Sequence, residues 1–310
     1  MPGQANEWRA ALPELRGSWA EQAPLAQLTW FRTGGPAEVL FTPADEADLA
    51  YALSRLPSDV PITVIGLGSN LIIRDGGVPG VVVRLGKAFA EIAIGPESRI
   101  KVGAGSPDVK VARAAADAAI DGLSFLRGIP GSLGGALPTN AGAHGGELKD
   151  VFVSARGVAR DGSSTHFTLT DMGFSYRHSA APAGVIFTEV TLAGQPGDRD
   201  AILAEMNRVT AAREASQPIK ERTGGSTFAN PPGQSAWKLV DAAGCRGLML
   251  GGAQVSPMHT NFLVNRGSAT SADIEALGEE VRRRVLETSG VELRWEIRRI
   301  GVASPSAGLA

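Results

Sequence analysis

The sequence has little of several residue types on which common functions depend. It contains a single cysteine, Cys245, which excludes an internal disulfide framework and a thiolate metal cluster. We expect this residue to be a small buried hydrophobe. The four histidines lie far apart, none at metal-ligand spacing, so we predict no metal site. Aromatic residues make up only 5% of the chain, which argues against a base-stacking platform.

Charge of one sign and long apolar runs are also scarce. Thirty basic residues against thirty-two acidic ones leave a net charge of −2, so no diffuse attraction to nucleic acid or anionic membranes is expected. No run approaches the roughly 18 apolar residues of a spanning helix. Residues 1–10 (MPGQANEWRA) lack the apolar segment of a secretory signal. We therefore expect a cytoplasmic monomer with neither nucleic acid nor membrane as a partner.

Glycine, by contrast, is abundant. The chain has 39 glycines, about 13% of its residues against an average near 7%. They show neither collagen nor linker periodicity, which indicates backbone packed closely against something bulky.

Predicted strands and helices are mixed without strict alternation, so the fold class is α+β. Residues 42–45 (TPAD) predict a helix start with Thr42 as N-cap. Residues 106–108 (SPD) predict a second helix that runs to Ile120 and ends before Gly122. Residues 128–146 are predicted to form an ordered loop, and residues 292–300 the last strand. Two longer helices are expected after residue 198 and over residues 272–289, with inward faces formed by Ile202, Met206, Val209, Ile274, Leu277, Val281 and Val285.

The first glycine loop, residues 66–71 (GLGSNL), follows a predicted strand at once. Gly66 and Gly68 around Leu67 let backbone N–H groups converge on an anion, and Ser69 and Asn70 add side-chain donors. The loop is neither a Rossmann fingerprint, whose third glycine is missing, nor a Walker loop. The alternative is a hairpin turn that needs a positive φ. Phosphate binding and the turn are equally favoured by this motif alone.

The second glycine loop consists of residues 129–135 (IPGSLGG) followed by residues 140–142 (NAG). So many glycines bring backbone amides close to a flat or extended ligand without obstruction by Cβ atoms. The alternative is a tight packing turn between two strands. Together the two loops favour a large cofactor, with a pyrophosphate at one loop and a ring system at the other.

These loops belong to a series of motifs that resembles, in order, the UDP-N-acetylenolpyruvoylglucosamine reductase family, in the shorter of its two types. The resemblance spans residues 28–301. Ala229 departs from it, because the family usually has lysine there. The matching motifs are residues 32–37 (RTGGPA), 66–71 (GLGSNL), 129–135 (IPGSLGG), 140–142 (NAG), 175–177 (SYR), 224–228 (GGSTF), 230–231 (NP), 251–253 (GGA), 259–262 (HTNF), Asn265 and 296–298 (EIR) before Gly301.

The resemblance implies an FAD-binding fold of the vanillyl-alcohol-oxidase type, with two α+β subdomains, and a third α+β domain that binds substrate. The expected divisions are a lead-in (1–26), FAD subdomain 1 (27–88), FAD subdomain 2 (89–196), the substrate domain with a C-terminal catalytic strand (197–302) and a flexible tail (303–310).

The resemblance also implies an activity. NADPH would reduce the enolpyruvyl group of UDP-N-acetylglucosamine enolpyruvate by way of FAD, giving UDP-N-acetylmuramate for peptidoglycan synthesis, cell shape and cell division. Some relatives in the wider fold attach flavin through a histidine or cysteine near the first loop. Residues 60–90 contain neither, so we expect FAD to be bound non-covalently.

Three residues carry the implied chemistry. Arg177 would hold the substrate carboxylate in a bidentate fork, and Ser226 would donate a proton to the carbanion. Glu296 would either stay protonated beside the substrate carboxylate or orient the proton donor. Their alternatives are a surface ion pair, a turn residue and a solvated strand residue. His259 is slightly favoured as a hydrogen-bonded structural histidine. The resemblance implies that Asn230 and Asn261 contact substrate. It also implies that the following residues contact the cofactor: Gly66, Leu67, Gly68, Ser69, Asn70, Leu71, Ile129, Pro130, Gly131, Ser132, Gly134, Gly135, Asn140, Ala141, Gly142, Arg213 and Arg298.

Two other functions compete with this one. A flavin-dependent sugar or alcohol oxidase of the same fold would consume O₂, and the presence of Arg177, Ser226 and Glu296 argues against it. A non-catalytic nucleotide-binding module would more readily have lost one of the three.

Overall fold

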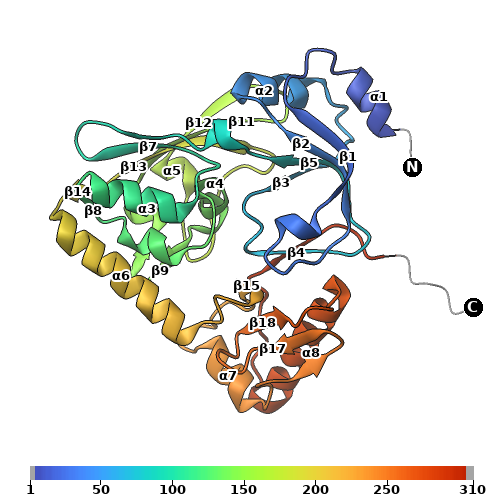
Figure 1. The fold of residues 1–310 in the computed structure, drawn as a ribbon, viewed down its shortest axis with the longest axis vertical. Coiled ribbons are helices and arrows are strands. Elements are labelled where there is room, and N and C mark those ends of the chain that lie inside the picture. The colour runs from blue at the N-terminus through green and yellow to red at the C-terminus, as the bar shows by residue number, and fades with distance from the viewer. Residues whose placement is uncertain (1–3, 305–310) are drawn as a thin grey trace, which may run out of the picture. The chain divides into compact units, whose positions relative to one another are not determined.

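The computed structural model describes residues 4–304, and the chain divides into two compact units (Figure 1). Unit 1 comprises the chain up to Glu21, Val39–Leu67 and Gly80–Ala212. Unit 2 comprises Gln22–Glu38, Gly68–Pro79 and the chain from Arg213 onward. The part of the predicted tail beyond residue 304 lies outside the described residues. The functional division into three domains stays a prediction.

The first sheet of unit 1 has the strand order β1-β2-β5-β3 and is covered by helix α2 (Glu46–Arg55). Alternate residues of β2 are buried, among them Val39 and Phe41, as expected for a strand with one face on a core. Leu49 and Leu53 form the apolar stripe of α2 in the same core. The strands are β1 (Ser18–Pro24), β2 (Pro36–Thr42), β3 (Ile62–Ile65) and β5 (Val78–Arg84), and helix α1 (Gln4–Ala10) precedes them.

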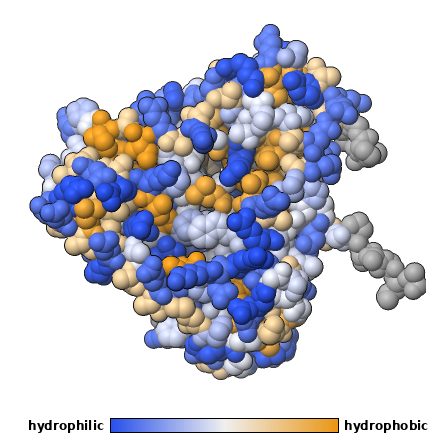
Figure 2. Space-filling model, viewed as in Figure 1, coloured by the Kyte–Doolittle hydropathy of each residue, from blue (hydrophilic) through white to orange (hydrophobic). Residues whose placement is uncertain are grey.

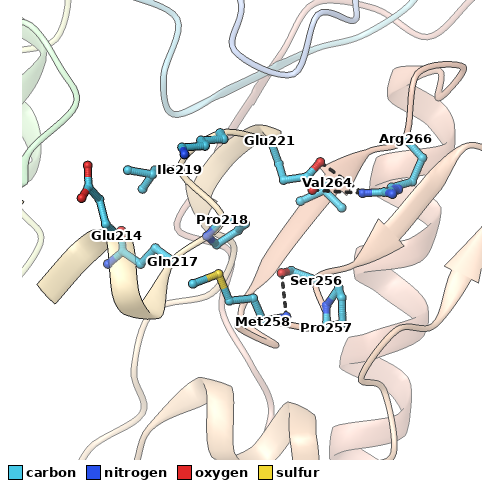
Figure 3. Close-up of a pocket in the computed structure, with 11 residues that line it drawn as sticks. Glu214, Gln217, Pro218, Ile219, Glu221, Ser256, Pro257, Met258, Val264 and Arg266 are labelled. Atoms are coloured by element: carbon cyan, nitrogen blue, oxygen red, sulfur yellow. Dashed lines mark hydrogen bonds and ion pairs between the residues drawn. The ribbon is translucent and has the colours of Figure 1, made fainter. Parts of the chain in front are cut away.

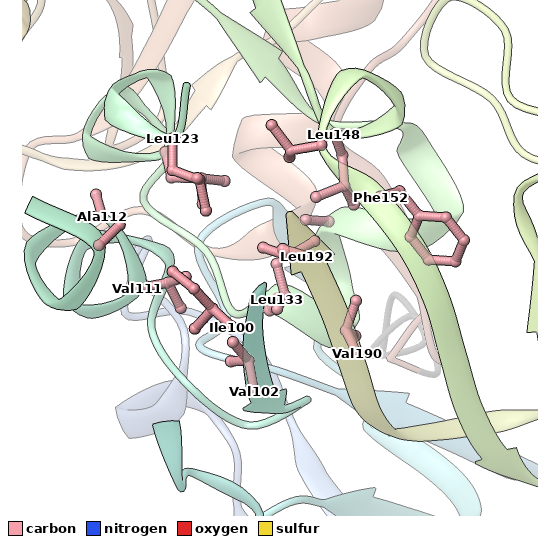
Figure 4. Packing of buried hydrophobic residues seen from close by; sticks show 14 of the residues in the cluster. Ile100, Val102, Val111, Ala112, Leu123, Leu133, Leu148, Phe152, Val190 and Leu192 are labelled. Atoms are coloured by element: carbon pink, nitrogen blue, oxygen red, sulfur yellow. The ribbon is translucent and has the colours of Figure 1, made fainter. Parts of the chain in front are cut away.

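The second sheet of unit 1 is antiparallel and has the order β12-β11-β13-β7-β6. Figure 4 shows how Val111 of helix α3 packs with Ile100 and Val102 of β7. Leu133 of the second glycine loop enters the same core and is fully buried, so it anchors that loop. The elements are β6 (Ile92–Ile94), β7 (Arg99–Gly103), α3 (Asp108–Asp117), β8 (Ile120–Asp121), β11 (Phe152–Val158), β12 (Ser164–Thr168), α5 (Leu169–Met172), β13 (Ile186–Ala193), β14 (Gln195–Pro196) and α6 (Arg199–Ser216).

Unit 2 has a four-stranded antiparallel sheet of order β15-β18-β17-β16, covered by helices α7 and α8. The predicted inward face of α8 is buried, and Gly290 ends the helix at φ 71, as expected. A separate parallel pair joins β4 to β19, with Leu71 opposite Arg298. The elements are β4 (Leu71–Ile73), β15 (Arg222–Ser226), α7 (Ala236–Ala242), β16 (Met249–Leu250), β17 (Ala253–Val255), β18 (Phe262–Asn265), α8 (Ser271–Ser289) and β19 (Arg298–Ile300).

The surface carries no dominant patch on the face drawn in Figure 2, where hydrophilic and hydrophobic residues are interspersed. Among the described residues, no helix is both long enough and apolar enough to cross a membrane.

Two predicted helix ends are wrong. Helix α2 is capped by Asp45, whose carboxylate accepts the Asp48 N–H, and not by Thr42. Helix α3 ends at Asp117, because Ala119 takes the left-handed conformation (φ 53) that was expected of a glycine. Gly122 instead follows the short strand β8.

The predicted loop over residues 128–146 and the predicted last strand are also corrected. The loop contains helix α4 (Leu133–Ala136) and the strand pair β9 (Gly142–Ala143) and β10 (Gly146–Glu147), with a 3₁₀ turn at Leu137–Thr139. The last strand is only Arg298–Ile300, so Glu296 precedes it and does not lie on it.

Candidate functional site

The first glycine loop connects β3 to β4. Gly68 has φ 66, and a Cβ atom there would overlap the carbonyl of Leu28, so the chain itself requires glycine at this position. The positive φ of the alternative is therefore present, but the loop is not a hairpin turn, because β3 pairs with β5 and β4 pairs with β19. Contact of the loop with an anion stays a prediction. The Asn70 amide donates to the carbonyl of Glu296 at 3.3 Å. Asn70 thus holds the backbone of Glu296, a predicted catalytic residue.

The start of this loop lies against the second glycine loop within unit 1. A Cβ atom on Gly66 would overlap the hydroxyl of Ser132. Gly135 is exposed, and a Cβ atom there would meet only Ser132 Oγ, at an ordinary 3.4 Å. The fold as described therefore leaves room over Gly135. A close pair of glycine-rich turns, one of which carries an exposed glycine, suits a flat cofactor such as FAD.

The second glycine loop is fixed to the segment that precedes helix α3. Leu133 N–H donates to the carbonyl of Ser106 at 3.0 Å, and Gly134 N–H donates to that of Ala104 at 2.8 Å. In the opposite direction, Asp108 N–H donates to the carbonyl of Gly131 at 3.0 Å. These bonds tie the loop backbone to residues 104–108.

Asn140 joins the second glycine loop to the turn that carries Arg177. Its buried amide donates to Glu147 at 3.0 Å and to the carbonyl of Ser175 at 3.1 Å, while its oxygen accepts the Lys149 N–H. The Asn140 side chain is thus used within the protein, and its N–H donates to the carbonyl of Leu137 at 3.2 Å, so its contact with a cofactor stays a prediction.

Arg177 lies in a tight turn closed by mutual backbone hydrogen bonds between Ser175 and His178. It has φ 55, and its guanidinium donates to the carbonyl of Gly142 at 3.1 Å and lies 5.3 Å from the centre of the Tyr176 ring. Arg177 is thus a half-buried residue with a left-handed backbone, and its guanidinium contacts the second glycine loop.

Ser226 and Glu296 come together in unit 2. Ser226 ends strand β15, and the next residue, Thr227, accepts the Glu296 N–H at its carbonyl at 2.8 Å. Both predicted catalytic residues are half-buried. The structure therefore joins the backbone of Glu296 to that of the residue after Ser226, although the two segments lie far apart in the sequence.

The two predicted substrate amides have different surroundings. Asn261 is buried, and its amide exchanges two hydrogen bonds with the backbone of Phe228, at 3.0 and 2.8 Å. It thereby holds the chain that follows Ser226, which favours a positioning role over the predicted substrate contact. Asn230 is exposed, and its oxygen caps the start of α7 by accepting the Ala236 N–H at 2.9 Å.

The remaining predicted residues are placed as follows. Arg213 donates to Gln217 at 3.2 Å, and Arg298 is exposed on β19. His259 is packed against Phe262, its Nδ1 accepts the Asn261 N–H at 3.3 Å, and burial lowers its pKa, as expected of a structural histidine. Cys245 is buried, as predicted, and burial raises the pKa of its thiol.

A cavity of about 330 Å³ lies in unit 2 between the end of α6 and the chain after β17 (Figure 3). Glu221 and Arg266 form an ion pair on one side of it, and Met258 and Pro218 contribute apolar surface. None of the predicted catalytic residues lines this cavity.

One residue beside the second glycine loop, Asp108, was not predicted from the sequence to belong to the site. It stands at the start of α3, where the sequence suggested a cap, but its side chain caps nothing. The carboxyl is fully buried, and neither oxygen has a hydrogen-bond partner among the described residues. Burial raises its pKa well above the usual value, although the nearby Gly131 N–H opposes this in part. The only sequence signal was an acid directly after Ser-Pro.

Comparisons with known proteins give matches to both parts of the chain. A family model described as an FAD binding domain matches residues 37–168, and one described as the C-terminal domain of UDP-N-acetylenolpyruvoylglucosamine reductase matches residues 217–300. The chain is 68% identical over 293 residues to the UDP-N-acetylenolpyruvoylglucosamine reductase of Azorhizobium caulinodans, covering 94% of this chain and 95% of the relative. The corresponding protein of Methylorubrum extorquens is 66% identical over 300 residues, covering 96% and 97%.

A solved structure gives the same result. The crystal structure of UDP-N-acetylenolpyruvylglucosamine reductase from Thermus caldophilus superposes with a TM-score of 0.80 at 36% identity, over 92% of this chain and 99% of that one. The predicted α+β fold with an FAD-binding domain of the vanillyl-alcohol-oxidase type is confirmed, and the sugar or alcohol oxidase is not favoured. The chain thus belongs to the UDP-N-acetylenolpyruvoylglucosamine reductase family, and it is an FAD-dependent oxidoreductase that uses NADPH to convert UDP-N-acetylglucosamine enolpyruvate into the peptidoglycan precursor UDP-N-acetylmuramate.

Proposed function

We propose that Arg177, Ser226 and Glu296 carry the reduction of the enolpyruvyl group. Bound FAD supplies the hydride chemistry that links NADPH to this group, and the two glycine loops would hold it non-covalently. Negative charge then develops on the carbon next to the substrate carboxylate. Arg177 would hold that carboxylate, because a guanidinium stays charged and binds a carboxylate through two parallel hydrogen bonds.

Ser226 is the proposed proton donor. A free hydroxyl is a weak acid, but the developing carbanion is a strong base and the transfer is short. The observation that supports this role is the bond from Glu296 N–H to the carbonyl of Thr227, which holds the backbone of the glutamate at the residue after Ser226. Glu296 would orient the donor or remain protonated beside the substrate carboxylate.

The other assignments have smaller roles. We propose that the backbone of the two glycine loops, with Arg213 and Arg298, binds FAD or nucleotide phosphates, and that Asn230 contacts substrate. Asn261 supports the site by holding Phe228 in place. A sugar nucleotide and NADPH are both cytoplasmic metabolites, so we place the enzyme in the cytoplasm, where its product would serve cell shape and division.

Replacing Ser226 by alanine tests the proton donor. Flavin content should be unchanged, and NADPH should bleach the flavin absorbance at nearly the parent rate, since that step needs no proton from Ser226. Recovery of the absorbance after adding the enolpyruvyl sugar should slow roughly 10²–10⁴-fold, the usual contribution of a positioned general acid. Ser226→Cys should regain part of the loss, because a thiol still donates a proton.

Rapid-mixing absorbance measurements separate the two steps. Equal loss in both would mean that Ser226 only shapes the pocket, and no loss in the second step would remove it from the mechanism. Size-exclusion chromatography with light scattering tests the proposed monomer, which should elute with the mass of one chain.

A further inference from the structure

Asp108 is a carboxyl without an ordinary structural task. It does not cap its helix, it is fully buried, and both of its oxygens lack hydrogen-bond partners among the described residues. Burying a polar group without a partner costs free energy, and such groups persist where they serve a function. The segment that carries Asp108 also supports the second glycine loop, so the unpartnered carboxyl lies next to a predicted cofactor-binding element.

The position of the carboxyl relative to that loop is specific. Its Oδ2 lies 3.0 Å from the point where a side chain of Gly131 would begin, and the Asp108 N–H already donates to the carbonyl of Gly131. The Gly131 N–H faces the carboxyl but does not reach hydrogen-bond geometry.

Burial raises the pKa of the carboxyl, and its neighbours offer it no opposite charge. Residues 104–107 and 129–132, which pack against it, contain no ionisable side chain. On the neighbouring elements, Lys110 and Arg113 of α3 are exposed, and Arg127 donates to Thr210. A neutral acid can accept the Gly131 N–H without placing a negative charge behind a loop that faces an anionic cofactor.

We propose that Asp108 is a positioning residue for flavin: its buried carboxyl accepts the Gly131 N–H when FAD is bound, and so holds the second glycine loop in its flavin-binding conformation. This rests on the proposed assignment of the loop to FAD. The unpartnered carboxyl lowers the stability of the cofactor-free protein, and flavin binding relieves that cost. Asp108 therefore lowers the free energy of unfolding of the cofactor-free protein and raises its affinity for FAD.

Two variants of the full chain separate this role from simple packing. Asp108→Asn keeps a neutral carbonyl acceptor of the same size, and Asp108→Val removes the acceptor but stays apolar and compact. After flavin removal, FAD affinity is measured by fluorescence quenching and unfolding by urea titration. Asp108→Val should raise the Kd for FAD about ten-fold, the effect of one buried hydrogen bond, while the cofactor-free protein becomes no less stable. Asp108→Asn should restore the parent Kd and the parent visible absorption bands of bound flavin.

The opposite results overturn the proposal. Parent-like FAD affinity in Asp108→Val, or an affinity loss in Asp108→Asn as large as in Asp108→Val, would show that the acceptor is not used. Parallel loss of stability and affinity in Asp108→Val would show a packing role only.

Gly135→Val tests the underlying loop assignment separately, since a Cβ atom there makes only an ordinary contact within the protein. If Gly135→Val binds FAD like the parent, the loop assignment fails. If it binds FAD weakly while Asp108→Val binds normally, only the role of Asp108 fails.

Discussion

At the scale of single residues, the proposed role of Arg177 can be tested through the shape of its side chain. Its left-handed backbone and its bond to Gly142 hold the guanidinium in one place. Arg177→Lys keeps the charge but loses the planar fork, so reoxidation of the flavin by the enolpyruvyl sugar should slow roughly 10- to 100-fold, as for a lost charge-assisted hydrogen bond. Rapid mixing measures this rate, and flavin content should not change.

Arg208→Lys is the matched control, because Arg208 forms an exposed ion pair with Glu205 on α6. Its reoxidation rate should equal that of the parent. If Arg177→Lys behaves in the same way, Arg177 is merely a surface ion-pair residue.

Asp108 also predicts how stability depends on pH. Its pKa is raised in the folded state by burial, so between the ordinary value of 3.8 and the raised value the folded state binds a proton that the unfolded state has released. Stability contributed by this group therefore falls as pH rises through that window. Asp108→Asn cannot ionise, so urea titrations should give the same stability for both proteins near pH 3.5 and an increasing advantage for the variant toward neutral pH. A constant difference across this range would contradict the shift.

At the scale of elements, helix α8 was predicted closely because its signals are local. Thr270 and Asp273 form a capping box, four apolar residues share one face, and Gly290 ends the helix in the left-handed conformation. Glu296 and Asp108 were misjudged because their settings depend on distant partners. Strand pairing with β4 begins only at Arg298, and the burial of Asp108 is created by the second glycine loop. No window of sequence around either residue contains that information.

The capping box of α8 gives an element-scale prediction. Thr270→Val removes the oxygen that accepts the Asp273 N–H and should lower the free energy of unfolding by about 1 kcal/mol. Thr288→Val on the same helix removes a hydroxyl that only bonds back to helix carbonyls, and it should change stability little. Urea unfolding of both variants tests this, and similar losses in the two would show that the cap is unimportant.

At the scale of the whole molecule, the motif series predicted the family and the fold, since its members keep their order along nearly the entire chain. Non-covalent FAD should be released completely when the protein is precipitated with acid, leaving a colourless pellet. Colour retained in the pellet would show covalent attachment. Added FAD should also raise the melting temperature of deflavinated protein in a concentration-dependent way, because a ligand that binds only the folded state stabilises it by mass action.

The pairing of β4 with β19 affects how the chain folds during its synthesis. Asn70 leaves the ribosome 226 residues before Glu296, the partner of its amide, a delay of roughly 10–45 s at ordinary translation rates. Unit 1 is complete in sequence at Ala212, whereas unit 2 needs segments from the beginning, the first third and the end of the chain. The nascent protein can therefore fold its second glycine loop while β4 still lacks its partner strand. The unit that contains Ser226 is the last to form, and a chain that stops before Arg298 cannot complete it.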